Sequence, residues 1–479
     1  MNTRMIAHLL SIILLIEAAL LIFPMAVALI YGESLMPFLL TIGIMLLLAL
    51  PFALHKPRNS RIYAKDGFVC VAAAWILMGA FGALPFVFSG AIPNYVSAFF
   101  ETVSGLTTTG ASILTEIESL PRGILFWRSF THWIGGMGVL VFMLAILPLA
   151  GGQTMHLMRA EVPGPTKGKL VPKMRRTAMI LYGIYIAMTA ILVILLLLCR
   201  MPLFDALVNA FGTAGTGGFS VLNNSIAGYQ NPAAEWVMAI FMILFGINFN
   251  LYYFLLIRRW REAVKSEELR VFLILVILAT AVIAINTWHL YNTAEVCLRT
   301  AFFQVSTIIS TAGFSTVNYD LWPELSKAVL ILLMLTGSCA GSTAGGLKMS
   351  RVIILVKSTL REIRHVLRPR SINVVRLEGE AIPDETVRSA TSYLALYMIL
   401  FVLTVLLISV DGFSLETNLT ATLACINNVG PGLKEVGPAG NFAGYSLFSQ
   451  ALLSLNMLLG RLEIMPVLIL LTPRSWKKH

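Results

Sequence analysis

A short segment of threonine, glycine and small residues occurs four times in this chain of 479 residues. Each copy follows a short apolar stretch and lies between two long hydrophobic runs. Four glycine-centred backbone segments can surround one ion with carbonyl oxygens that replace its hydration shell. The sequence therefore predicts an ion-conducting pore. The four copies are Thr108-Thr109-Gly110-Ala111-Ser112, Thr216-Gly217-Gly218-Phe219-Ser220, Thr311-Ala312-Gly313-Phe314-Ser315 and, with less agreement, Asn428-Val429-Gly430-Pro431-Gly432.

The composition indicates which class of protein contains these loops. Hydrophobic residues make up 57% of the chain and charged residues 12%, and the mean hydropathy is +0.82. A soluble core cannot hide that much apolar surface, so the chain is expected to be a polytopic membrane protein. Most apolar runs reach the roughly 20 residues that a bilayer helix needs. Ten crossings are predicted, around residues 5–31, 37–54, 68–90, 125–150, 178–199, 235–257, 269–288, 326–360, 390–410 and 446–471.

Four further stretches, about 96–107, 204–214, 296–309 and 416–427, are too short or too polar to span a membrane, and each leads into a loop. They are predicted to be re-entrant half-helices. Their carboxyl ends carry roughly half a negative charge and favour a cation. One such loop is explained equally well as a turn or a helix-packing contact. Four copies in matching positions favour a pore, because non-helical backbone at membrane depth is tolerated where it lines a cavity.

Basic residues indicate the orientation, because Lys and Arg in short loops resist translocation. With a cytoplasmic amino terminus, 28 of the 35 basic residues lie in inner segments, so both termini are predicted to be cytoplasmic and all four loops to face the outer half. The same bias, with the anionic inner leaflet, explains the net charge of +11 without nucleic acid. Membrane lipid is therefore an expected partner, and nucleic acid is not.

The order of these elements divides the chain into a hairpin and four units. Residues 1–60 are predicted to form a transmembrane hairpin. The units follow at 61–176, 177–264, 265–380 and 381–479, each a span, a half-helix, a loop and a second span. The predicted fold is an all-α polytopic membrane protein with four pseudo-symmetric units around a central pore. The polar inner connections 151–177 and 361–389 are candidate surfaces for a soluble partner.

Two features predict a barrier below the loops. The run 326–360 is interrupted by a glycine-rich segment, which a helix tolerates poorly because each glycine costs up to about 1 kcal/mol relative to alanine. It is not a phosphate-binding loop, because Leu347 occupies the lysine position and Lys348 follows one residue late. Arg461 lies inside the last span, and its expected partners are carbonyls of that segment. A static packing contact is the alternative to a gate. The candidate gate residues are Gly337, Gly341, Gly345, Gly346, Lys348 and Arg461.

The loops, the Trp133-Ile134-Gly135-Gly136-Met137-Gly138 segment and the glycine-rich break resemble the TrkH/KtrB/HKT superfamily of potassium transporters over essentially the whole chain. The hairpin makes the chain similar to the bacterial TrkH/TrkG branch. The resemblance implies the same gate and a potassium filter built on backbone carbonyls. The register stays open in the second loop, where two glycines compete, and in the fourth, where Asn428 and Pro431 depart from the pattern. The implied filter residues are Thr108, Thr109, Gly110, Thr216, Gly217, Gly218, Thr311, Ala312, Gly313, Asn428, Val429 and Gly430.

The resemblance also implies potassium as the transported ion, a location in the bacterial cytoplasmic (inner) membrane and a homodimer with one pore per subunit. Cytoplasmic TrkA-like nucleotide-binding subunits would regulate it, so this chain would hold no organic cofactor. Sodium- or proton-coupled symport is the alternative, and it would need an acid beside the path. The candidates Glu17, Glu101, Asp205 and Glu416 read more simply as cap or interface residues. No protease or hydrolase motif accompanies His132, so an enzyme is not expected.

Overall fold

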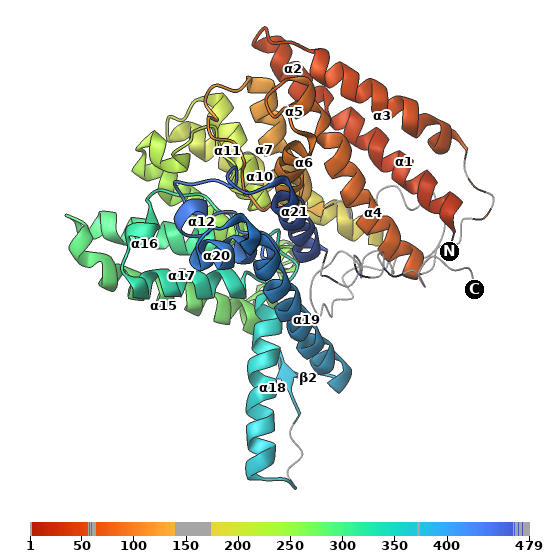
Figure 1. Ribbon diagram of the computed structural model, residues 1–479. Helices are drawn as coiled ribbons and strands as arrows, with labels where there is room; N and C mark the ends of the chain where they lie inside the picture. Colours follow the sequence, from red (N-terminus) through yellow and green to blue (C-terminus); the bar gives the residue numbers. More distant parts are fainter. Residues whose placement is uncertain are drawn as a thin grey trace.

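The computed structural model describes residues 2–55, 57, 59, 64–138, 174–370, 374–462, 464, 468 and 472. These residues form a bundle of helices and one antiparallel hairpin, in which β1 (Arg376–Leu377) pairs with β2 (Glu380–Ala381) (Figure 1). Large apolar side chains such as Leu47 and Ile285 remain exposed on the long helices. An apolar exterior of this kind suits lipid contact. The predicted class, an all-α polytopic membrane protein, is confirmed.

Within the described residues, six helical segments are long and apolar enough to cross a membrane, or seven if one bent pair counts as a span. Ten crossings are predicted from the sequence. The runs 125–150 and 446–471 extend beyond the described residues, as does the connection 151–177, and the run 326–360 is divided in two. The six segments are Thr3–Ile30, Met36–Leu54, Asp66–Phe88, Met179–Leu198, Glu267–Leu290 and Asp384–Asp411.

The amino-terminal helices lie at one edge of the molecule (Figure 1). Here α1 (Thr3–Leu20) packs on α3 (Met36–Leu54) and on α4 (Ala64–Gly82), while α2 (Ile22–Ile30) lies against α7 (Arg122–Gly136). Gly123 of α7 permits that approach, because a Cβ there would lie 2.9 Å from the Cβ of Ala28. The hairpin therefore packs directly on the segment that follows the first loop.

Four short helices lead into the four loops: α6 (Tyr95–Leu106), α11 (Leu203–Gly215), α16 (Ala294–Ile309) and α20 (Leu415–Ile426). Their bounds agree closely with the predicted half-helices. Side chains of Asn94, Thr293 and Ser414 cap the first turns of α6, α16 and α20 by accepting backbone N–H groups. Such caps satisfy donors that have no intrahelical partner. All four helices are largely buried, so their carboxyl ends lie inside the bundle.

The second unit contains a break that was not predicted from the sequence. The run 235–257 is predicted as one span, but α12 (Pro232–Phe245) and α13 (Phe249–Leu256) meet at 90°. Bonds to the glycine-rich segment replace those lost in the bend: Cys339 N donates to Gly246 O at 3.2 Å and Phe249 N to Gly341 O at 3.0 Å. Backbone groups at a helix break need such partners, so the two breaks stabilise each other.

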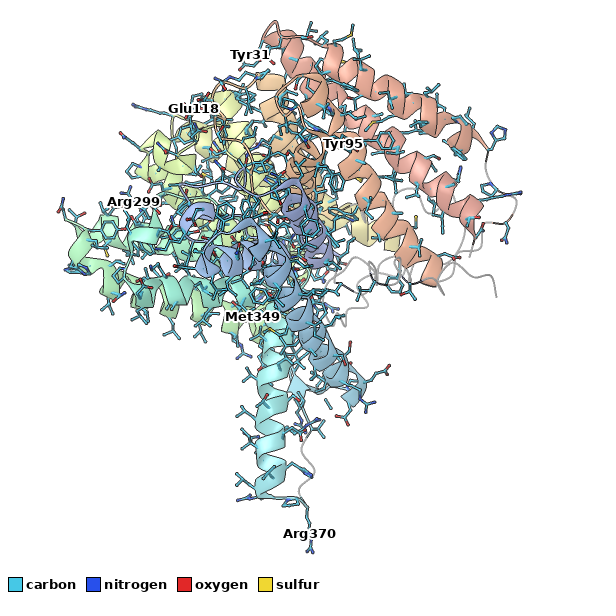
Figure 2. The ribbon with its side chains drawn as sticks, viewed as in Figure 1. Tyr31, Tyr95, Glu118, Arg299, Met349 and Arg370 are labelled. Atoms are coloured by element: carbon cyan, nitrogen blue, oxygen red, sulfur yellow. The ribbon has the colours of Figure 1, made fainter. Side chains whose placement is uncertain are left out.

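The third unit is divided between α17 (Glu324–Thr336) and α18 (Met349–Leu367), which the glycine-rich segment 337–348 connects. Figure 2 shows α18 projecting from the body, with Met349 at its base and Arg370 beyond its tip. The remaining helices are α5 (Leu84–Phe88), α10 (Met174–Leu198), α14 (Trp260–Lys265), α15 (Glu267–Thr287), α19 (Asp384–Ile408), α21 (Leu447–Arg461) and the 3₁₀ turns η2 (Ser225–Tyr229), η3 (Trp288–Leu290), η4 (Tyr319–Leu321), η5 (Ser409–Asp411) and η6 (Lys434–Val436).

Candidate pore loops and the segment beneath them

The four loops share one backbone conformation. A residue in the left-handed region occurs in each, followed two residues later by a glycine that also has positive φ. This pattern resolves the register: Gly218, not Gly217, is the central glycine of the second loop, and the fourth loop aligns as Asn428-Val429-Gly430. The φ values are 55°, 56°, 57° and 56° at Thr108, Thr216, Thr311 and Asn428, and 82°, 80°, 81° and 99° at Gly110, Gly218, Gly313 and Gly430.

The hydrogen bonds that close each short helix also repeat. The residue after the left-handed one donates its N–H to a carbonyl five residues earlier, which is the long bond of a Schellman motif. Glycine usually takes the left-handed position, and β-branched residues there are outliers. Threonine occupies it three times, so the loops store backbone strain that the surrounding contacts must hold. The four bonds, each 2.8 Å long, join Thr109 to Ser104, Gly217 to Gly212, Ala312 to Thr307 and Val429 to Ala424.

The loops contact one another in cyclic order. The Cα of each central glycine faces the carbonyl of the residue before the next loop's glycine, so closely that no Cβ would fit. The fourth loop closes the cycle onto the first. An ideal Cβ would lie 1.9 Å from Gly217 O at Gly110, 2.1 Å from Ala312 O at Gly218, 2.3 Å from Val429 O at Gly313 and 2.6 Å from Thr109 O at Gly430.

A buried histidine explains the extra glycine in the second loop. His132 of α7 lies behind that loop, where its Nδ1 is 2.8 Å from Gly105 O and its Nε2 accepts the N–H of Phe219 at 3.2 Å. A Cβ at Gly217 would lie 2.3 Å from Nδ1 of the ring. The other loops carry larger residues at the equivalent position. Gly217 is therefore required by packing against His132, whereas Gly218 is required by the neighbouring loop.

A buried ion pair ties the first and second loops together on the side beyond their glycines. Arg128 Nε lies 2.7 Å from Glu101 Oε1, and Arg128 Nη1 donates to Ser220 O at 3.0 Å. Glu101 also accepts the hydroxyl of Ser112 and the N–H of Ile113, both at 2.9 Å. Glu101 is thus an interface residue, as expected, but its partner Arg128 was not predicted from the sequence. The signal that could have identified Arg128 is its charge inside the apolar run 125–150.

The other junctions between loops are joined mainly by hydrogen bonds of uncharged groups, together with the N–H of Lys434, which donates to Asp320 Oδ2 at 2.7 Å. Ile226 N donates to Ser315 O at 3.1 Å, and the hydroxyl of Tyr319 donates to Gly432 O at 3.1 Å. Between the fourth and first loops, Asn428 Nδ2 donates to Thr109 Oγ1 and to Met457 O, both at 3.0 Å. Asn428 thus replaces the threonine of the other loops with a side chain that bridges two units.

Arg461 at the end of α21 connects the first loop with the glycine-rich segment. Its Nη1 donates to Thr343 O at 2.8 Å and to Thr108 Oγ1 at 3.2 Å, and its Nη2 lies 2.5 Å from Gly135 O. A contact with Gly136 O at 3.1 Å completes the set. The expected partner, a carbonyl of the segment, is present. The carbonyls at the end of α7 were not anticipated, because nothing in the sequence relates two sites so far apart.

The four loops in cyclic contact form a ring. The glycine-rich segment lies directly against the ring residues that have left-handed backbone conformation. Gly345 N donates to Thr311 Oγ1 at 2.8 Å, and the hydroxyls of Thr216 and Thr343 are 3.5 Å apart. A Cβ at Gly345 would lie 2.3 Å from Asn427 O, so this glycine fills a site under the fourth loop. Residues 343–345 therefore touch the second, third and fourth loops at the ends of their helices.

The other candidate gate residues do not share this position. Gly337 packs on Gly346, whose Cα would be 3.0 Å from a Cβ at Gly337, and Gly341 lies beside Asn248 at the bend of the second unit. The ammonium of Lys348, which is buried, donates to Ala344 O. These residues shape the segment, whereas two of the candidate gate residues, Gly345 and Arg461, contact the ring directly.

The donor set of the site consists of backbone carbonyls and hydroxyls. The carbonyl ends of four helices converge here, which favours a cation. In the described ranges, no group of three or more His, Cys, Asp or Glu could hold a metal ion. Main-chain oxygens grouped in this way are the ligands that selectivity filters offer to a cation.

Comparison with known proteins agrees with this architecture. Residues 38–478 match the TrkH family, described as a cation transport protein. The chain is 36% identical to the Trk system potassium uptake protein TrkH of Salmonella typhimurium and 33% identical to TrkG of Escherichia coli, each over 100% of both chains. It also resembles the crystal structure of the potassium transporter TrkH from Vibrio parahaemolyticus, with a TM-score of 0.90, 31% identity and 100% coverage of both chains. This multi-pass membrane protein belongs to the TrkH family of cation transport proteins.

Proposed function

We propose that the chain carries potassium into the cell through a channel-like pore whose filter is the ring of four loops. The cyclic contact of the four central glycines supports this most directly, because it places four backbone segments around one centre. The relatives named as potassium uptake proteins support the choice of ion. The proposed potassium ligands are the carbonyls of Thr108, Thr109, Gly110, Thr216, Gly217, Gly218, Thr311, Ala312, Gly313, Asn428, Val429 and Gly430.

The glycine-rich segment and Arg461 are proposed to form the gate. Their position under the ends of the helices supports an obstruction on the side of the ring that faces α18. The segment is not a regular helix, and individual hydrogen bonds hold it in place. An intramembrane arginine also needs partners, which here are carbonyls of the segment and of α7. Movement of residues 343–345 away from the ring would open the path.

We propose that the transport is uncoupled and that the membrane potential drives it. Each 100 mV contributes about 2.3 kcal/mol per charge, which suffices to accumulate a cation. A coupled symporter would need an available acid near the path. Among the candidate acids, Glu101 is buried behind the ring, and it is engaged by Arg128, Ser112 and Ile113. This engagement supports a structural role for Glu101.

The protein is further proposed to lie in a bacterial cytoplasmic membrane, with both termini and α18 in the cytoplasm, and to act as a homodimer with TrkA-like regulatory subunits. Three relatives' names place them in a Trk system. Helix α18 projects beyond the body (Figure 1). Several of its exposed residues are basic, which offers a surface for such partners. In this orientation the ring faces the outer half of the membrane, as the positive-inside bias predicts. For the hairpin and the four repeat units, the proposed boundaries are those predicted from the sequence.

The first test is rubidium and potassium flux into liposomes that contain the purified protein, with sodium and lithium as competitors. Gly430→Ser is measured alongside, because this position packs against Thr109 O and has a φ of 99°. A preference for potassium that weakens in the variant is expected. Flux that is indifferent to the substitution would refute the filter. A reversal potential that follows potassium alone would support uncoupled transport, whereas dependence on a sodium or proton gradient would support symport.

The second test addresses the gate by single-channel recording. Arg461→Ala removes the contacts with Thr343 and with the carbonyls of α7. Hydrogen bonds to a charged group contribute about 1.5–3 kcal/mol each, so the open probability should rise by about tenfold or more. Shortening the segment within 337–346 should have the same direction of effect. An unchanged open probability in both variants would refute the gate.

A further inference from the structure

One buried carboxylate holds both ends of the glycine-rich segment. Glu268 is the second residue of α15, and its side chain is 7% exposed. Its Oε1 accepts the backbone N–H of Ala340 at 2.8 Å and that of Ser350 at 2.9 Å. Ala340 lies near the start of the segment, and Ser350 lies in the first turn of α18 just after its end. A single oxygen atom thus joins the entrance and the exit of the segment to another helix.

The chemistry of this contact suits a carboxylate. The first N–H groups of α18 have no intrahelical acceptors, and the positive end of its dipole favours an anion. The N–H of Ala340 is likewise left unpaired by the break that ends α17. A buried donor without a partner destabilises the conformation that contains it. Glu268 therefore stabilises the broken conformation in particular, since an unbroken helix would not present these two donors together.

The preceding residue connects the same site to the β-hairpin and to α18. Glu267 pairs with the ammonium of Lys357 on α18, and its Oε2 accepts the N–H of Glu378 at 3.2 Å in the turn between β1 and β2. Lys357 Nζ also donates to Arg376 O at 2.9 Å. Adjacent residues at the start of α15 thus hold two different parts: Glu267 holds the β-hairpin and α18, and Glu268 holds the glycine-rich segment.

We infer that Glu268 is a positioning residue of the gate: it keeps the segment in the conformation that sets residues 343–345 against the ring, and Glu267 passes displacement of the β-hairpin and α18 to that segment. The inference rests on the proposed function, because it has consequences for transport only where the segment obstructs the path. Glu268 touches neither the ring nor the ion. Its effect is therefore on the time the path is open and not on which ion passes.

Single-channel recording of the full-length protein in bilayers tests this role with Glu268→Ala and Glu268→Gln. Alanine leaves both N–H groups without an acceptor, so the open probability should rise about tenfold. Glutamine keeps an oxygen at the same place and should restore an open probability within about twofold of the unchanged protein. The permeability ratio of potassium to sodium should be the same in all three. Equal open probability in the alanine variant and the unchanged protein would overturn the inference, as would a glutamine variant that behaves like alanine.

A second variant tests the link to the β-hairpin. Lys357→Met removes the partner of Glu267 and should raise the open probability about threefold, without adding to the effect of Glu268→Ala. Glu262→Ala is the matched control, because Glu262 is a half-exposed acid on α14 that pairs with Arg259. If Glu268→Ala fails to fold, Lys357→Met decides: a raised open probability supports the inference, and an unchanged one overturns it.

Arg461→Ala, recorded in parallel, separates this inference from the gate itself. A rise in open probability with Arg461→Ala but none with Glu268→Ala or Lys357→Met would overturn the role of Glu268 and leave the gate intact. A response from none of the three would overturn the gate, and the inference with it. A rise in all three, with ion preference unchanged, is the expected result.

Discussion

The ring of four loops differs in its construction from the layer beneath it, which consists of the glycine-rich segment 337–348 and Arg461. In the ring, one backbone conformation and one pair of helix-closing bonds occur four times, with φ values that agree within 2° at the left-handed position. In the layer beneath, the third unit alone supplies the segment 337–348 and the fourth alone supplies Arg461. A site that surrounds an ion needs four equivalent contacts, whereas a barrier that moves needs only one part. The difference suits the two proposed roles.

The contacts between the two regions are also unequal. Thr108 receives the guanidinium of Arg461, Thr216 meets the hydroxyl of Thr343, and Thr311 accepts the N–H of Gly345. Identical positions of the ring thus have three different partners below. If the layer moves, each loop loses a bond of different strength. Substitutions of the four central glycines should therefore act alike, and substitutions at the contacts between the ring and the segment should act by different amounts.

The largest change in potassium flux is expected when a central glycine of the ring is substituted. In Gly218→Ala the new Cβ would lie 2.1 Å from Ala312 O, at a φ of 80°. Left-handed strain of about 1–2 kcal/mol and overpacking of about 1–3 kcal/mol against backbone that cannot move predict a loss of potassium flux of about 100-fold. Rubidium flux into liposomes measures it, with the potassium to sodium preference as a second readout.

Gly412→Ala is the control for Gly218→Ala. It has nearly the same dihedral strain, with φ 77°, but a Cβ there would meet nothing within 4 Å. Its flux should stay within about twofold of the unchanged protein, because only the strain is added. Similar losses in both variants would mean that strain alone, and not contact between loops, explains the ring glycines.

A smaller loss of potassium flux is expected at Gly217, where the second loop differs from the other three. In Gly217→Ala the Cβ would lie 2.3 Å from Nδ1 of His132, a side chain that can shift at the cost of its bonds to Gly105 and Phe219. Those bonds are worth about 0.5–1.5 kcal/mol each, so flux should fall about tenfold. Ala312→Gly, the reverse change in the third loop, should alter flux by less than about threefold. Equal effects of the two would contradict the role assigned to His132.

The sequence could predict the repeated part of the molecule better than its unique part. The bounds of α6 and α20 lie within one residue of the predicted 96–107 and 416–427, because apolar stretches and glycine loops leave strong local signals. The bend at Gly246 was missed, since a single glycine in an apolar run is common in membrane helices. The partners of Arg461 on α7 and the contacts of Glu268 depend on residues far apart in the chain. No local pattern records such contacts.

Substitutions in the layer beneath the ring should have smaller effects than substitutions of ring glycines, and they should increase transport instead of reducing it. Arg461→Lys keeps a positive charge but loses the planar fork that reaches Thr343 O and Gly135 O together. The open probability should rise about fivefold, less than with alanine, because one ammonium can still bind one carbonyl. Single-channel recording measures it. A lysine variant indistinguishable from the unchanged protein would show that charge alone holds the segment.

The smallest effect should distinguish individual contacts between the ring and the segment. Thr311→Val removes the acceptor for the buried N–H of Gly345, while Thr216→Val removes a hydroxyl that is 3.5 Å from Thr343 Oγ1. An unpaired buried donor costs more than a long hydroxyl contact, so the open probability should rise about threefold with Thr311→Val and less than about 1.5-fold with Thr216→Val. Both substitutions keep β-branching, so the left-handed strain is unchanged. Equal responses would mean that the four positions act as one ring even toward the segment, and that the asymmetry of their hydrogen bonds has no part in gating.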